Sequence, residues 1–191
     1  MSFENTIWRE IYFNSIIPAI ASSNPLHVIG VGSCLAYGSI MQGPVNIHLE
    51  CQPDTEYGRT KLDVMKRFNN TVKTSTFTWA RLFYVYGGKE NEMKLVPALR
   101  KKIASGEDFD FEKPDIITDF VHVEHIAESV YWIIRNRHAG VVNVGSGSPV
   151  RNGDLYNLLK CKEKITPTER KSSGVYSSDV FICDPSLRIR S

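Results

Sequence analysis

The stretch LHVIGVGSCLAYG, residues 26–38, joins a short apolar run to three glycines. The run and the glycine that ends it predict a buried strand over residues 26–32. Gly30 and Gly32 also form a G-x-G pair, which is how a phosphate-binding turn between a strand and a helix begins. The glycines therefore either end a buried strand or open a phosphate-binding turn, and the two cases predict different functions.

A dinucleotide-binding turn needs the pattern G-x-G-x-x-G followed by a helix. Leu35 stands in the place of the third glycine, and Ser39–Pro44 is predicted as a loop. The pair GSGS over 145–148 is followed by Pro149, which interrupts a helix. Around Ser33 the hydrolase pattern G-x-S-x-G is missing. The sequence therefore argues against a phosphate loop and against a hydrolase elbow.

Composition predicts one soluble globular domain, because 42% of the 191 residues are hydrophobic and 23% are charged. A net charge of +2 with scattered basic residues argues against nucleic acid and membrane surfaces as partners. The four cysteines include no C-x-x-C pair, so we expect a reduced, cytoplasmic protein. His122 and His125 are spaced as H-x-x-H, but we interpret them as part of a strand that enters a helix, with no metal.

The apolar pattern alternates between strands and helices. Residues 7–20 have helical spacing, and we expect Pro18 to kink or end that helix. Alternating strands and helices predict an α/β fold with parallel strands. Other predicted helices cover 57–68, 93–104 with Gly106 as its cap, 123–135 with a stripe of Ile126, Val130, Ile133 and Ile134, and 152–159; other predicted strands cover 76–82, 108–112, 116–123 and 141–145.

Tyr57 and Lys61 lie four residues apart, one above the other on a predicted helix. This spacing suits a tyrosine acid/base assisted by a lysine, and it also suits an exposed pair on a helix surface. A free phenol has a pKa of about 10, roughly 3 units too high for catalysis near neutrality. One nearby cation supplies about 1 to 3 units, so a second positive charge, such as an oxidised nicotinamide, would help.

A serine that ends a strand, then a loop, a Tyr/Lys helix and another strand resemble the extended short-chain dehydrogenase/reductase family. Its members are NAD(P)-dependent nucleotide-sugar epimerases, dehydratases and reductases. The separation of 24 residues between Ser33 and Tyr57 (57 − 33) is typical of the family. The segments that carry the resemblance are VGSCLAYG (31–38), YGRTK (57–61), RLFYVYGG (81–88), DFVHVEHIAESV (119–130) and NVGSG (143–147).

The resemblance implies an α/β fold, a partial Rossmann-like doubly wound parallel sheet with a small C-terminal substrate-binding region. Residues 1–90 would be the C-terminal half of the Rossmann-like domain, with the Ser/Tyr/Lys motif. Residues 91–191 would be a truncated substrate-binding region, interleaved with the last Rossmann elements. The family's glycine-rich N-terminal half has no counterpart in the sequence, so we expect a truncated chain or a separately encoded N-terminal half as partner.

The family's roles carry over by position. Ser33 would bind the reacting carbonyl or hydroxyl, and Tyr57 would exchange the proton. Lys61 would hold the nicotinamide ribose of NAD or NADP and lower the pKa of the phenol. The remaining expected site residues are Phe83 at the nicotinamide end of the cofactor, and Tyr84 and Lys94 at the nucleotide-sugar substrate.

The resemblance leaves three functions open. Many relatives have asparagine at Tyr84, and an aromatic residue there is more similar to 4-ketohexose reductases, which transfer hydride at sugar C4. Thr118 stands at the arginine of the motif R-D-F-x-H-V. The first alternative is a 4-epimerase or 4,6-dehydratase, although Cys34 and Leu35 lack the acid/base pair of a dehydratase. The second is a non-catalytic remnant that acts as an assembly subunit. A homodimer through the helices over 5–21 and 57–70 is expected.

Overall fold

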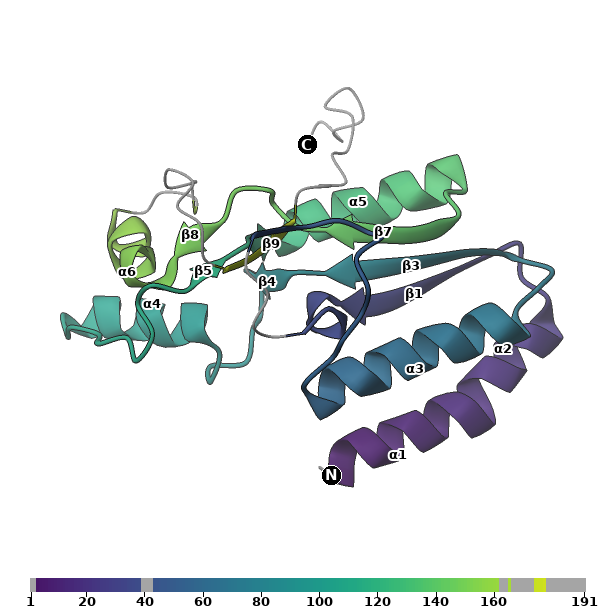
Figure 1. Ribbon diagram of the computed structural model, residues 1–191. Coiled ribbons are helices and arrows are strands. Elements are labelled where there is room, and N and C mark those ends of the chain that lie inside the picture. Colours follow the sequence, from purple (N-terminus) through teal and green to yellow (C-terminus); the bar gives the residue numbers. More distant parts are fainter. Residues whose placement is uncertain (1–2, 39–42, 162–164, 166–173, 178–191) are drawn as a thin grey trace.

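The computed structural model describes residues 3–38, 43–161, 165 and 174–177. Its central sheet has three parallel strands in the order β1-β3-β7: β1 (His27–Ser33), β3 (Thr76–Leu82) and β7 (Gly140–Val144). Helices α2 (Ile17–Ser23) and α3 (Glu56–Thr71) cover one face, and α5 (Val123–Asn136) covers the other (Figure 1). The predicted α/β fold with parallel strands is confirmed.

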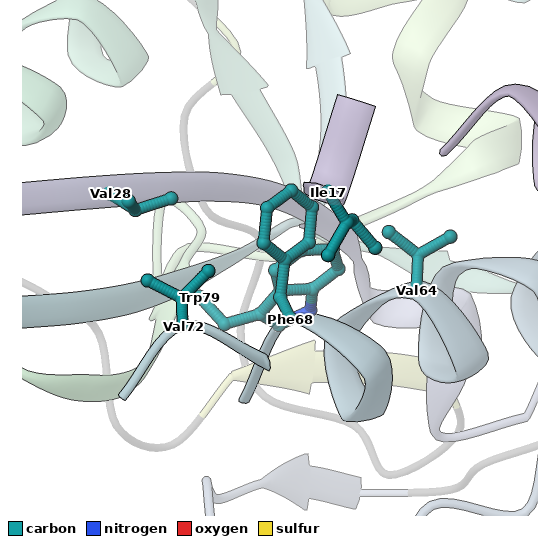
Figure 2. Packing of buried hydrophobic residues seen from close by; sticks show 6 residues of the cluster. All are labelled: Ile17, Val28, Val64, Phe68, Val72 and Trp79. Carbon is teal, nitrogen blue, oxygen red and sulfur yellow. The ribbon is translucent and has the colours of Figure 1, made fainter. Parts of the chain in front are cut away.

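One apolar core lies between the central sheet and helices α2 and α3. Figure 2 shows the indole of Trp79 at the centre of this cluster. Helices α2 and α3 contribute apolar side chains that pack against it, which explains their apolar spacing in the sequence. The buried members of the cluster are Ile17, Val28, Val64, Phe68, Val72 and Trp79.

The glycine pair of β1 makes room for that indole. A Cβ atom on Gly30 would lie 2.2 Å from Cε3 of Trp79, and one on Gly32 would lie 2.3 Å from Nε1. Real Cβ atoms do not approach other heavy atoms this closely. A short 3-10 helix, Cys34–Ala36, follows the strand in place of a long helix. The G-x-G pair is therefore a packing feature, as the sequence argument against a phosphate loop predicts.

Pro18 was predicted to kink or end the N-terminal helix, and the structure shows that the helix does not end there. The helix begins as α1 (Phe3–Ile11), passes through a π-helical turn over Tyr12–Ile16 and continues as α2. Proline has no N–H to donate to the preceding turn. The wider π turn lies directly before it, so Pro18 occupies an early position of a new α-helical segment, where the missing N–H costs little.

Smaller strands and two helices make a second layer beyond the carboxyl ends of β1 and β3. Helix α4 (Leu95–Ser105) ends at Gly106 with φ 71°, which confirms the predicted cap. Strands β4 (Tyr84–Tyr86) and β6 (Phe120–His122) pair in parallel, and β5 (Ile117–Thr118) pairs antiparallel with β8 (Val150–Arg151). The other elements are helix α6 (Asn152–Lys160) and strands β2 (Gly43–Val45) and β9 (Gly174–Ser177).

Three local predictions differ from the structure. Residues 108–112 form no strand; Phe109 and Phe111 pack edge-on against each other, with ring centroids 4.7 Å apart, and join the apolar cluster of α4 and α6. The loop predicted over Ser39–Pro44 gives way to β2 from Gly43 onward, and residues 39–42 lie outside the described residues. On α5, Ile133 is buried but Ile134 is 55% exposed, since neighbours on a helix point about 100° apart.

The strand predicted over 116–123 is interrupted at Asp119, which is fully buried. Its carboxylate accepts hydrogen bonds from the backbone N–H of Ser146 (2.8 Å) and of Gly147 (3.1 Å), and from the Ser146 hydroxyl. Its backbone carbonyl accepts from the N–H of Tyr84. Asp119 therefore ties the second layer to the turn that follows β7.

Among the described helices, none is long and apolar enough to cross a membrane.

The first prediction concerns Gly30. We expect Gly30→Ala to lower the free energy of unfolding by about 1 to 3 kcal/mol, because the added methyl group overlaps the indole in a packed core. In a Trp79→Leu background the same substitution should cost clearly less, since the clashing atoms are gone. Chemical denaturation of the four chains measures this coupling, and equal costs in both backgrounds would contradict the packing account.

The second prediction concerns Asp119. Asp119→Asn should destabilise the fold by about 1 to 3 kcal/mol, because an amide NH₂ cannot accept from the N–H groups of the turn after β7. Asp115→Asn is the matched control: Asp115 is largely exposed and pairs with Arg151 on the surface, so its loss should change stability by less than about 1 kcal/mol. A similar loss in both variants would rule out a special role for the buried carboxylate.

Candidate active site

A cavity of about 420 Å³ lies where β1 and β3 end and the second layer begins. Five of the six site residues predicted from the sequence line it: Ser33, Tyr57, Phe83, Tyr84 and Lys94. Lys61 lies next to it, in a smaller cavity of about 220 Å³ between α1 and α3 that Tyr57 also lines. The fold thus gathers residues from distant parts of the chain around one space.

Ser33 is the last residue of β1 and begins the 3-10 helix Cys34–Ala36. Its hydroxyl oxygen accepts a hydrogen bond from the N–H of Leu35 at 3.2 Å. The hydroxyl also contacts the thiol of Cys34, whose burial raises its pKa to about 12. Cys34 is therefore a neutral thiol beside the serine, and nothing in its surroundings activates it as a nucleophile.

Close packing of α3 against the end of β1 brings Tyr57 to the cavity. The side chain of Thr55 caps the helix by accepting from the N–H of Gly58 at 3.1 Å. A Cβ atom on Gly58 would lie 2.3 Å from the carbonyl oxygen of Leu35. Glycine between the tyrosine and the rest of the helix therefore allows α3 to touch the turn that carries Ser33.

Lys61 binds the free side of β1. Its Nζ donates to the carbonyl oxygen of Val31 at 3.1 Å and lies 5.7 Å from the centre of the Tyr57 ring. Partial burial lowers the pKa of Lys61. The lysine therefore stands beside the tyrosine as predicted, with its ammonium over the ring face.

The pKa of Tyr57 is raised above its ordinary value in this structure, first by burial and then by nearby Cys34 and Tyr12. Lys61 is not among the causes of this shift. The direction of this shift is therefore set by burial, and the expectation that Lys61 lowers the pKa stays a prediction. Tyr57 is protonated at neutral pH, which makes it a hydrogen-bond donor.

Phe83 and Tyr84 enter the cavity from the segment that leaves β3. The N–H of Phe83 donates to the carbonyl of Val144, and that of Tyr84 to the carbonyl of Asp119, so both neighbouring layers hold this segment. Phe83 is buried, and partial burial raises the pKa of Tyr84 to about 12. Tyr84 therefore presents a neutral hydroxyl.

A buried polar cluster holds the chain after Ser33 against the sheet. Nη1 of Arg81 donates to the Tyr37 hydroxyl at 2.6 Å, and this hydroxyl donates to Oδ1 of Asn143 at 2.8 Å. Nδ2 of Asn143 donates to the carbonyl of Val45. The guanidinium also lies 4.5 Å from the centre of the Tyr37 ring. The cluster links the segment that follows β1 to β2, β3 and β7.

Sequence reasoning did not select several residues that line the cavity. Glu90 is the one with chemistry of its own, and its signal was weak: an acid after the two glycines that follow β4. The apolar lining that was missed comes from β3, β4, β6 and the first turn of α4, and no short motif marks it. These residues are Leu82, Val85, Leu95, Val96 and Phe120.

His122 and His125 do not form part of a metal site in the described residues, where no group of three or more possible metal-ligating side chains is found. Nδ1 of His122 accepts from the N–H of Glu124 and so caps α5. The segment runs from a strand into a helix, as interpreted from the sequence.

Solved structures with the same fold include enzymes whose names state a nucleotide-sugar. A UDP-N-acetylglucosamine 4-epimerase from Methanobrevibacter ruminantium M1, in complex with UDP-N-acetylmuramic acid, has a TM-score of 0.70 and 20% identity over 90% of this chain and 56% of its own. A putative epimerase from Burkholderia cenocepacia J2315 has a TM-score of 0.80 and 17% identity over 97% and 65%. A UDP-N-acetylglucosamine 4-epimerase from Bacillus cereus has a TM-score of 0.73 and 20% identity over 89% and 61%.

These likenesses establish the fold, and the chain spans between 56% and 65% of the length of those three structures. None of the curated proteins matches the chain. The sequence model of the NAD dependent epimerase/dehydratase family matches residues 9–145. This range is most of the chain and includes Ser33, Tyr57 and Lys61. The chain therefore belongs to the NAD dependent epimerase/dehydratase family.

Proposed function

We propose that this chain provides the substrate-binding part and the nicotinamide end of an NAD(P)-dependent nucleotide-sugar oxidoreductase, and that it acts as a 4-ketohexose reductase. The observation that carries the proposal is that Ser33 and a protonated Tyr57 line one cavity. Two hydroxyl donors suit a carbonyl oxygen that becomes negative when the carbonyl carbon is reduced. Residues 1–90 would form the C-terminal half of a Rossmann-like domain with the Ser/Tyr/Lys motif, and residues 91–191 the substrate-binding region.

The chemistry is a ketone reduction at sugar C4. The cofactor, when bound, supplies a hydride to that carbon. Ser33 donates a hydrogen bond to the carbonyl oxygen and holds it in place. Tyr57 transfers its proton to the same oxygen, so the ketone becomes an alcohol and the tyrosine becomes a phenolate. Solvent then returns a proton to Tyr57.

The residues around Lys61 suit the ribose next to a nicotinamide. An ammonium group has three N–H donors, and the carbonyl of Val31 accepts from one. The other two would bind the pair of ribose hydroxyls, and the buried ring of Phe83 would support the nicotinamide end of NAD or NADP. A separately encoded N-terminal half that supplies a glycine-rich turn for the pyrophosphate is part of this proposal.

Tyr84 and Lys94 would bind the nucleotide-sugar. The raised pKa of Tyr84 keeps its hydroxyl a donor at neutral pH. Lys94 precedes the first residue of α4, and no side chain caps that helix end. Free helix N–H groups and an ammonium together attract an anion, which suits the diphosphate.

A 4-epimerase or 4,6-dehydratase is the second candidate, and the names of the matching structures favour it. Both reactions begin with oxidation at C4, for which Tyr57 must first lose its proton. The aromatic residue at Tyr84 favours the reductase instead, as inferred from the sequence. Cys34 is neutral and Leu35 is apolar, so neither provides the extra acid/base of a dehydratase.

A homodimer through α1, α2 and α3 is part of the proposal. Ile7, Trp8 and Ile11 on α1 are 42%, 56% and 38% exposed, which is unusual for large apolar side chains on one helix. The same surface would serve a non-catalytic assembly subunit, the remaining alternative.

Cysteines 34, 51 and 161 are free, in keeping with a cytoplasmic location.

The third prediction tests the cofactor site. We expect NADH or NADPH to bind saturably in a fluorescence titration, and Lys61→Ala to weaken binding about ten-fold or more, because charge-assisted hydrogen bonds are lost. Tyr57→Phe should keep binding within about three-fold but abolish reduction of a 4-ketohexose nucleotide. Lys66→Ala is the control, since Lys66 lies on the same helix but lines neither cavity at Tyr57.

Two results would count against this function. One is the absence of binding by either nucleotide up to about 1 mM, which corresponds to less than about 4 kcal/mol of binding free energy and would count against a cofactor site formed by this chain alone. The other is an equal loss in Lys61→Ala and Lys66→Ala, which would show that the general charge of α3 matters and the position of Lys61 does not.

The fourth prediction follows from the raised pKa of Tyr57. The folded chain holds this proton more tightly than the unfolded chain, so the contribution to stability is complete below about pH 10 and is lost as the pH rises through the folded pKa. The difference in absorbance at phenolate wavelengths between wild type and Tyr57→Phe should therefore appear only above about pH 10. A transition near pH 8 in the cofactor-free chain would show that Lys61 activates the phenol unaided.

A further inference from the structure

Glu90 lies in the turn between β4 and α4 and faces the cavity that Ser33 and Tyr57 line. Gly87 and Gly88 have φ values of 95° and 70°, which let the chain turn back after β4. The N–H of Gly87 donates to Oε2 of Glu90 at 2.9 Å and fixes the carboxylate. The position of Glu90 is therefore set by the backbone of its own turn.

The second oxygen of this carboxylate is free to meet a ligand. Within the described part of the chain, no hydrogen bond to Oε1 of Glu90 is found. No ion pair joins Glu90 to Lys94 there either, although the two line the same cavity. A carboxylate oxygen with remaining acceptor capacity needs a donor, and in this cavity a bound molecule can supply it.

The charges of the cavity are few. Among its described lining residues, Glu90 is the only acid and Lys94 the only base. Lys94 is exposed at the start of α4 and is assigned above to the diphosphate. The rest of the lining consists of Ser33, Tyr57, Tyr84 and apolar residues. Apart from Lys94, nothing in the lining would offset a second negative charge brought next to Glu90.

We propose that Glu90 is a specificity-determining residue that accepts hydrogen bonds from the hydroxyls of a neutral hexose and excludes sugars that carry a carboxylate. The inference rests on the proposed function, since it assumes a nucleotide-sugar in this cavity. Each hydroxyl of a neutral sugar is a donor for Oε1. A uronate would place its carboxylate next to that of Glu90 in a partly buried site. Repulsion between the two negative charges would lower the affinity for the uronate about ten-fold or more.

The fifth prediction compares two nucleotide-sugars that differ at C6. In calorimetric titrations we expect the wild-type chain to bind UDP-glucose about ten-fold or more tightly than UDP-glucuronic acid. Glu90→Gln should bring this ratio to within about two-fold, mainly by tighter binding of the uronate. Glutamine keeps an acceptor for the N–H of Gly87, so the turn should survive. Sugar 1-phosphates of glucose and glucuronic acid repeat the comparison without a nucleotide.

Glu92→Gln is the matched control, because it removes the same charge two residues away at an exposed position that does not line the cavity. Its ratio should equal that of the wild type. In the wild-type chain, about 0.5 M salt should also reduce the ratio of the affinities for UDP-glucose and UDP-glucuronic acid, because salt ions screen the repulsion. This second measurement does not depend on the folding of a variant.

The outcomes separate the inference from the function on which it rests. Binding of UDP and of both sugars with equal affinity would overturn the role of Glu90 and leave the nucleotide-sugar site intact. The same conclusion would follow if Glu92→Gln changed the ratio as much as Glu90→Gln. Absence of binding by UDP, by both UDP-sugars and by both sugar phosphates would overturn the proposed function, and the inference with it.

Discussion

The indole of Trp79 occupies space that side chains on β1 would otherwise fill, and the positions of the other site elements depend on this contact. Gly30 pairs with Trp79 in the parallel register, so the indole crosses β1 only a few residues before that strand ends at Ser33. The same indole packs against Val64 and Phe68 of α3. One side chain therefore sets both the distance from the helix of Tyr57 to the sheet and the path of the strand that ends at the serine.

The protonation of the site follows from its burial. Tyr57 and Tyr84 both have raised pKa values, and the neighbouring thiol of Cys34 is neutral as well. Lys61 lies over the ring of Tyr57 and donates to a backbone carbonyl. The chain's own residues therefore favour a proton donor at Tyr57, and a base there would require positive charge from a bound molecule.

Sequence reasoning found what local patterns encode and missed what depends on distant contacts. The Ser33 strand and the Tyr57 helix were predictable, because apolar periodicity and the Y-x-x-x-K spacing are local. The reason for Gly30 was not, since the indole that requires glycine comes from another strand. The break at Asp119 was missed for a similar cause: its hydrogen-bond donors lie 27 and 28 residues further along the chain. Glu90 carried no motif, and the cavity alone gives it meaning.

The bond between Lys61 and Val31 also affects how the sheet meets other molecules. Among the described strands β1 pairs with β3 alone, and the carbonyl of Leu26 accepts from that neighbour. Because successive carbonyls of a strand alternate in direction, Val31 points to the opposite, unpaired edge. The side chain of Lys61, which belongs to α3, already occupies this position. A strand that approached β1 here would have to displace an ammonium group from the carbonyl of Val31.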